Sequence, residues 1–146
     1  MLKIGFIGLG TMGFPIAGHI SQSYETAVFN RTTNKSQKWA SEFKGEVCES
    51  IKDLALKSNV IFLCLSEDKD IEEVVLGSDG ILKHLNEGII VVDHSTTSSI
   101  SLSSLRHRKI TFDFKARSFI DSHTSPLNSE VHFCDFFVVL LNTAVS

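Results

Sequence analysis

Three glycines near the start of the chain have the spacing of a phosphate-binding turn. Gly8, Gly10 and Gly13 follow a short apolar segment that contains Ile4 and Ile7. The first glycine of this pattern permits a tight turn, the second lets phosphates approach the main chain, and the third lets the next helix pack closely. The amino terminus of that helix adds N–H donors and a positive dipole end. The spacing predicts a site for a dinucleotide pyrophosphate. The residues expected to form it are Gly8, Leu9, Gly10, Thr11, Met12 and Gly13.

A second polar group, Asn30-Arg31-Thr32, lies about 20 residues further on, where an NAD-binding protein usually has an acid that binds the ribose hydroxyls. No acid stands there. Asn30 can bind the ribose, Arg31 can pair with a 2′-phosphate, and Thr32 adds a hydroxyl. The group therefore predicts NADP as cofactor rather than NAD. The alternative is that Arg31 is a solvated surface residue and that Thr32 only caps the next helix.

Two more polar groups follow apolar segments further along the chain. Leu65–Ser66 would lie beside the adenosine ribose or the nicotinamide. In Asp93–Thr96, we expect Ser95 and Thr96 to be hydroxyl ligands at the mouth of the cofactor cleft, and His94 to face the sheet. The alternative for this segment is a helix cap rich in serine and threonine. A Ser-His-Asp triad is excluded, because neighbours along one strand point in opposite directions.

Alternating strands and helices are predicted to position these groups. Strands are expected at 4–7, 26–30, near 47, at 60–65 and at 89–92, and helices at 12–20, 33–43, 51–55, 68–76 and 81–85. The apolar run Val60–Leu65 is typical of a parallel strand at the centre of a sheet. Ser50 and Asp53 resemble a capping box, and Asp68 is expected to cap its helix. The predicted fold class is α/β, a Rossmann-type doubly wound parallel sheet that is incomplete at its C-terminal end.

The composition indicates one domain with an atypical tail. The 146 residues are 42% hydrophobic and carry a net charge of -3, which gives no indication of binding to nucleic acid or to an anionic membrane. Cys48, Cys64 and Cys134 form no closely spaced pair, so we expect neither a disulfide framework nor a metal site, and a reducing cytoplasm. The apolar run Phe136–Leu141 is too short to span a bilayer.

The composition changes after about Leu105. All nine glycines lie at or before Gly88, whereas more than half of the eleven phenylalanines follow Leu105. We interpret residues 1–105 as an NADP-binding domain and 106–146 as a tail. The tail is expected either to add one strand around Ile110–Phe114 that closes the sheet edge, or to be disordered and prone to aggregation.

As an ordered set, these motifs resemble the β-hydroxyacid dehydrogenase family, which includes 3-hydroxyisobutyrate dehydrogenases and NADP-linked glyoxylate and succinic semialdehyde reductases. The resemblance spans about residues 1 to 104 and is carried by Gly8–Ala17, Asn30–Thr32, Leu65–Ser66 and Asp93–Thr96. It implies that the NADP site is lined by Leu65, Ser66, Asp70 and Thr96. It also implies that Ser95 lies near the substrate carboxylate.

The family pattern is lost where its catalytic part should begin. The family usually has a proline in the place of Ser99 and a helical second domain with a catalytic lysine, to which neither Lys109 nor Lys115 corresponds. We interpret the chain as a fragment of such an oxidoreductase, truncated or frame-shifted after about Leu105, with no catalytic residue of its own. It would supply NADP binding for hydride transfer to or from a small 3-hydroxy acid or aldehyde acid.

The alternative is a non-catalytic NADP-binding module that pairs with another chain. A Rossmann-type methyltransferase is disfavoured, because Asn30 and Arg31 stand where an acid would hold the ribose of the methyl donor. The residues do not identify the substrate or the oligomeric state.

Overall fold

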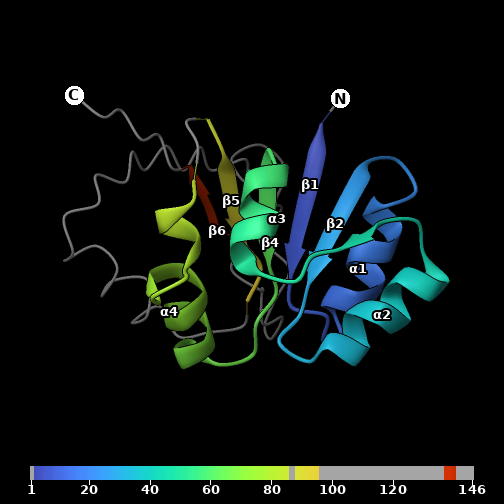
Figure 1. The fold of residues 1–146 in the computed structure, drawn as a ribbon, viewed down its shortest axis with the longest axis horizontal. Coiled ribbons are helices and arrows are strands. Elements are labelled where there is room, and N and C mark those ends of the chain that lie inside the picture. Colours follow the sequence, from blue (N-terminus) through green and yellow to red (C-terminus); the bar gives the residue numbers. More distant parts are fainter. Residues whose placement is uncertain (1, 86–87, 96–136, 141–146) are drawn as a thin grey trace, which may run out of the picture.

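The computed structural model describes residues 2–85, 88–95 and 137–140, and its centre is one twisted sheet (Figure 1). The strand order is β3-β2-β1-β4-β5-β6. The strands are β1 (Lys3–Ile7), β2 (Glu25–Phe29), β3 (Glu46–Val47), β4 (Val60–Leu63), β5 (Ile90–Asp93) and β6 (Phe137–Leu140). The first five strands are parallel, and β6 runs antiparallel to β5. This order of parallel strands confirms the predicted Rossmann-type fold class.

Helices cover both faces of the sheet. They are α1 (Gly13–Ile20), α2 (Thr33–Glu42), α3 (Ile51–Lys57) and α4 (Asp68–Leu76), followed by the short 3-10 helix η1 (Ile81–Lys83). Neighbouring residues of β1 point to opposite faces, as strand geometry requires. Phe6 joins a core cluster with Trp39 of α2, whereas Ile7 joins a second cluster with Leu54 of α3 and Ile71 of α4. Two apolar cores therefore fix the sheet between its helices.

Contacts of Trp39 hold α2 against α1. Its side chain is fully buried, and its Nε1 donates a hydrogen bond to the carbonyl of Phe14 at 3.2 Å. The ring of Phe43 packs against both Trp39 and Phe14, with each pair of ring centroids 5.7 Å apart. Because Phe14 lies in the first turn of α1, this cluster supports the end of the glycine turn.

Capping residues were predicted for the starts of two helices, and the structure confirms one of these two predictions. The Ser50 hydroxyl accepts a hydrogen bond from the Asp53 amide at 3.0 Å, which confirms the predicted cap of α3. The prediction for Asp68 is wrong, because Glu67 occupies the N-cap and Asp68 is the first residue of α4. The helix dipole favours acids throughout the first turn, so an acid alone does not mark the boundary.

The tail contributes β6 to the sheet, with Asp93 paired to Phe137. The strand predicted around residues 110–114, the predicted ligand Thr96 and the proposed boundary at 105 lie outside the described residues. No helix in the described part of the chain is both long and apolar enough to cross a membrane.

Candidate dinucleotide-binding site

The turn after β1 holds two of its glycines in close contact with backbone. Gly8 has a φ of +98°, a conformation that favours glycine, and its amide donates to the carbonyl of Phe29 at 3.1 Å. A Cβ atom at Gly8 would lie 2.2 Å from the carbonyl oxygen of Cys64. A Cβ atom at Gly13 would lie 2.0 Å from the carbonyl oxygen of Gly8. Packing therefore requires glycine at both positions.

Gly10 has a different environment. A Cβ atom built there would meet no protein atom within 4 Å. The position faces open space beside the amino terminus of α1, whose first turn contains no acid and whose N-cap, Met12, makes no side-chain capping bond. Amino termini of helices bind anions, although in this turn the Phe14 amide already donates to the Gly10 carbonyl at 3.1 Å and Pro15 has no N–H. The turn therefore fits a pyrophosphate, with room left at Gly10 for its approach.

Two adjoining cavities lie where the strands end. Their volumes are about 240 Å³ and about 710 Å³. Both are lined by Gly10, Lys35, Cys64, Leu65 and Ser66, so we treat them as one feature, the carboxyl-end cleft. The smaller cavity also contains the predicted residues Gly8, Asn30, Arg31, Thr32 and Asp70. The larger one contains the predicted residues Leu9, Thr11 and Met12. Ligands of open α/β sheets bind at this edge.

Asn30 links the glycine turn to the end of β2. Its Oδ1 accepts a hydrogen bond from the Leu9 amide at 2.9 Å, and its Nδ2 donates to the Thr32 carbonyl at 3.1 Å. These bonds fix the turn against the segment that carries Arg31. Binding of the ribose by Asn30 stays a prediction.

Arg31 and Asp70 form an ion pair in the smaller cavity. Nη1 of Arg31 lies 2.8 Å from Oδ1 of Asp70, in the first turn of α4. The Arg31 side chain is 75% exposed, whereas that of Asp70 is 14% exposed. The guanidinium therefore stands at the open edge of the cleft, held to a largely covered carboxylate.

The segment after β5 is held by hydrogen bonds to its neighbours. The Ser95 amide donates to Oδ1 of buried Asp93 at 2.8 Å, and the Ser95 hydroxyl accepts from the Leu65 amide at 2.9 Å. Ser95 thereby connects the ends of β4 and β5.

His94 lines the larger cavity and packs on Phe62, with the ring centroids 5.7 Å apart. It thus faces the sheet, as predicted. Burial lowers the pKa of His94, an effect that neighbouring Asp93 opposes.

Several cleft residues were not predicted from the sequence. Lys35 lies in the first turn of α2, directly after the Asn30–Thr32 segment, so its place beside the cleft could have been predicted from the expected start of that helix at Thr33. Glu73 and Val74 of α4, and Ile51 of α3, line the smaller cavity because helices from distant segments meet there. No local signal marks these three residues. Within the described residues, no group of histidine, cysteine and acidic side chains could hold a metal ion.

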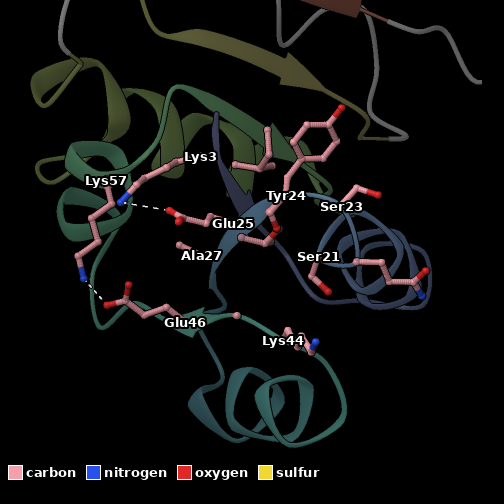
Figure 2. A pocket seen from close by; sticks show the side chains of 13 residues that line it. Lys3, Ser21, Ser23, Tyr24, Glu25, Ala27, Lys44, Glu46 and Lys57 are labelled. Carbon is pink, nitrogen blue, oxygen red and sulfur yellow. Dashed lines mark hydrogen bonds and ion pairs between the residues drawn. The ribbon is translucent and has the colours of Figure 1, made fainter. Parts of the chain in front are cut away.

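A further hollow of about 570 Å³ lies at the opposite, amino-terminal ends of β1 and β2 (Figure 2). Four of its charged side chains form two ion pairs, Lys3 with Glu25 at 3.3 Å and Lys57 with Glu46, and Lys44 also lines it. Its buried hydroxyl Thr26 donates to the Tyr24 carbonyl at 3.0 Å. These polar groups satisfy each other, so we assign no ligand to this hollow.

The strand order, the glycine turn and the cleft at the carboxyl ends define a Rossmann-type dinucleotide-binding domain. Residues 3–125 match the family described as the NAD binding domain of 6-phosphogluconate dehydrogenase, and the chain belongs to this family.

Several similar proteins are named oxidoreductases and are longer than this chain. An uncharacterized oxidoreductase of Shewanella frigidimarina is 42% identical over 100 residues, which are 68% of this chain and 34% of that protein. A probable 3-hydroxyisobutyrate dehydrogenase-like protein of Arabidopsis thaliana is 38% identical over 69% of this chain and 30% of its own length. The chain thus spans about a third of the curated relatives that it matches.

A solved structure, described as Psf3 in complex with NADP+ and 2-OPP, matches with a TM-score of 0.65 and 30% identity over 70% of this chain and 36% of that one. Together with the family match, these similarities confirm the prediction of an NAD(P)-binding domain of the β-hydroxyacid dehydrogenase-like oxidoreductases.

Proposed function

We propose that the carboxyl-end cleft binds NADP(H), with the pyrophosphate on the glycine turn and the 2′-phosphate on Arg31. The observation that carries this proposal is the open space at Gly10, between two glycines that are tightly packed. The exposed guanidinium of Arg31 supports the choice of NADP, and so does the NADP+ named in the complex of a 30% identical protein. Leu65, Ser66, Asp70 and Thr96 would also line the site, as the family resemblance implies.

The reaction class that we propose is hydride transfer between NADP and a small 3-hydroxy acid or aldehyde acid. The bound nicotinamide would supply or accept the hydride. Ser95 is proposed to bind the substrate carboxylate. Its hydroxyl oxygen accepts a hydrogen bond from the Leu65 amide, and the hydroxyl can still donate its hydrogen to a carboxylate oxygen. A cytoplasmic location stays a prediction.

We further propose that this 146-residue chain binds cofactor without turning over substrate. By resemblance, the catalytic lysine belongs to a domain beyond the roughly one third of the relatives that the chain matches. Purified chain would be supplied with NADPH and glyoxylate or succinic semialdehyde, or with NADP+ and a 3-hydroxy acid. Absorbance of the nicotinamide should stay constant, and enzyme-dependent turnover would contradict the binding-only proposal.

Calorimetric titration with NADPH and NADH tests cofactor binding directly. We expect Arg31→Ala to weaken NADPH binding by roughly 10- to 100-fold, because a charge-assisted hydrogen bond is lost. NADH binding should change little. Lys44→Ala is the matched control, since Lys44 lies at the hollow on the opposite edge of the sheet and should not affect either cofactor. Equal loss of both cofactors in Arg31→Ala, or none, would exclude Arg31 as the phosphate ligand.

A further inference from the structure

We propose that Asp70 determines cofactor specificity, by lessening the preference of the cleft for a dinucleotide that carries a 2′-phosphate. This inference rests on the proposed function, in which Arg31 receives that phosphate. It assigns to a residue of α4 a task that dinucleotide-binding sheets usually give to an acid at the end of the second strand.

The ion pair joins two walls of the same cavity. Arg31 follows β2, while Asp70 belongs to α4, which follows β4, and β1 lies between these two strands in the sheet. The 2.8 Å bond between Nη1 and Oδ1 therefore crosses the position of β1 at its carboxyl end. Since both residues line the smaller cavity, a phosphate bound by Arg31 would lie near the Asp70 carboxylate.

The charge of that carboxylate opposes phosphate binding. Asp70 is 14% exposed, so solvent screens it less than it screens Arg31, which is 75% exposed. The pair as a whole is electrically neutral, and a phosphate approaching Arg31 meets attraction and repulsion at similar distances. An isolated ion pair whose arginine is 75% exposed contributes little to folding stability. Its main consequence is therefore a weaker field for an anionic ligand.

The remaining charges of the cavity do not remove this effect. Lys35 adds a positive charge on the side of Arg31, and Glu73 adds a negative charge on α4, one turn beyond Asp70. The basic groups thus lie on one wall and the acidic groups on the other. Among these acids, Asp70 is bonded to Arg31, so its charge acts at the proposed phosphate position.

Asp70→Asn separates the charge of the side chain from its hydrogen bonding, because the amide keeps an oxygen that can accept from Arg31. Dissociation constants for NADPH and NADH would be measured by calorimetry at one ionic strength. We expect the preference for NADPH over NADH to rise about tenfold, because the dissociation constant for NADPH falls while that for NADH changes little. Glu73→Gln is the matched control, since it removes the same charge from the same helix and should change the preference less than about twofold. Asp70→Ser, which also suits the first turn of a helix, repeats the test if the asparagine variant does not fold.

The outcomes separate this inference from the proposed function. A raised preference in the Asp70 variants, with Glu73→Gln close to wild type, supports it. An unchanged or lowered preference, while wild type binds NADPH through Arg31, overturns the role of Asp70 and leaves the proposed function standing. Failure of the wild-type chain to bind NADPH, or full NADPH binding by Arg31→Ala, overturns both.

Discussion

The three glycines of the turn have different roles, although they are the same residue type. Gly8 and Gly13 are confined by carbonyl oxygens of Cys64 and Gly8, whereas the side-chain position of Gly10 is open. The first two are needed for the fold, and the third leaves room for a ligand. Substitution by alanine can therefore distinguish folding from binding within one hexapeptide.

Gly10→Ala should impair cofactor binding without unfolding the protein. The added methyl group meets no protein atom, so we expect the free energy of unfolding to change by less than about 1 kcal/mol. NADPH affinity should fall by more than about tenfold, since the methyl group occupies space that the pyrophosphate needs. Urea unfolding followed by circular dichroism, together with calorimetric titration, gives both quantities.

Gly13→Ala serves as the contrasting variant, because its methyl group would overlap the Gly8 carbonyl. It should lose stability by about 1–3 kcal/mol. Normal NADPH affinity in Gly10→Ala would show that the pyrophosphate does not approach this glycine.

Among the elements, α2 combines a well-packed anchor with one unsatisfied group. Trp39 is buried and hydrogen-bonded, but Ser36, three residues earlier on the same helix, is buried with no partner for its hydroxyl within the described residues. A buried hydroxyl without a hydrogen bond costs free energy.

Ser36→Ala should therefore stabilise the protein, by about 1 kcal/mol in the free energy of unfolding. The alanine also favours the helix more than serine does. Urea unfolding at constant pH measures the difference. Ser41→Ala on the same helix is the control for helix propensity, since the Ser41 hydroxyl is exposed and donates to the Lys38 carbonyl. A loss of stability in Ser36→Ala that exceeds the effect in Ser41→Ala would show that the Ser36 hydroxyl has a favourable contact.

The elements that the sequence predicted are those with local signals. The glycine spacing, the apolar run of β4 and the Ser50 cap each depend on a few adjacent residues, and the structure contains all three features. The contact between Arg31 and Asp70 could not be predicted, because it depends on strand order and on the orientation of α4. The acidic start of α4 was visible in the sequence, but its boundary was not, since Glu67, Asp68 and Asp70 suit adjacent positions equally well.

In the whole molecule, both edges of the sheet have ion pairs, but the carboxyl edge also has the open side of the glycine turn. At the amino-terminal edge, Lys3 and Lys57 are paired with acids within one hollow (Figure 2). At the carboxyl edge, the glycine turn and the amino terminus of α1 face the cleft. Ligand recognition is therefore expected at one edge alone.

Stability should depend on pH through His94. Burial lowers the pKa of His94 in the folded protein, whereas the unfolded chain takes up a proton near the ordinary value of about 6.5. The stability that comes from burying the neutral His94 side chain is thus complete above the unfolded pKa of about 6.5. It is lost as the pH falls through the lower, folded pKa. Urea unfolding at pH 7.5 and pH 5 should show a larger decrease for wild type than for His94→Gln. An equal decrease in both proteins would exclude His94 as a source of the acid sensitivity.

Trp39 is the single tryptophan of the chain, and its position allows its fluorescence to report on both ligand binding and unfolding. Its indole donates to the carbonyl of Phe14, a residue that lines the larger cavity of the cleft. With excitation at wavelengths that Tyr24 does not absorb, emission therefore originates at one buried site beside the ligand region. Reduced nicotinamide absorbs light in the range where indole emits, so bound NADPH would quench this emission through resonance energy transfer. The same fluorescence would shift to longer wavelength when α2 separates from the sheet, so one spectrum distinguishes an occupied domain from an unfolded one.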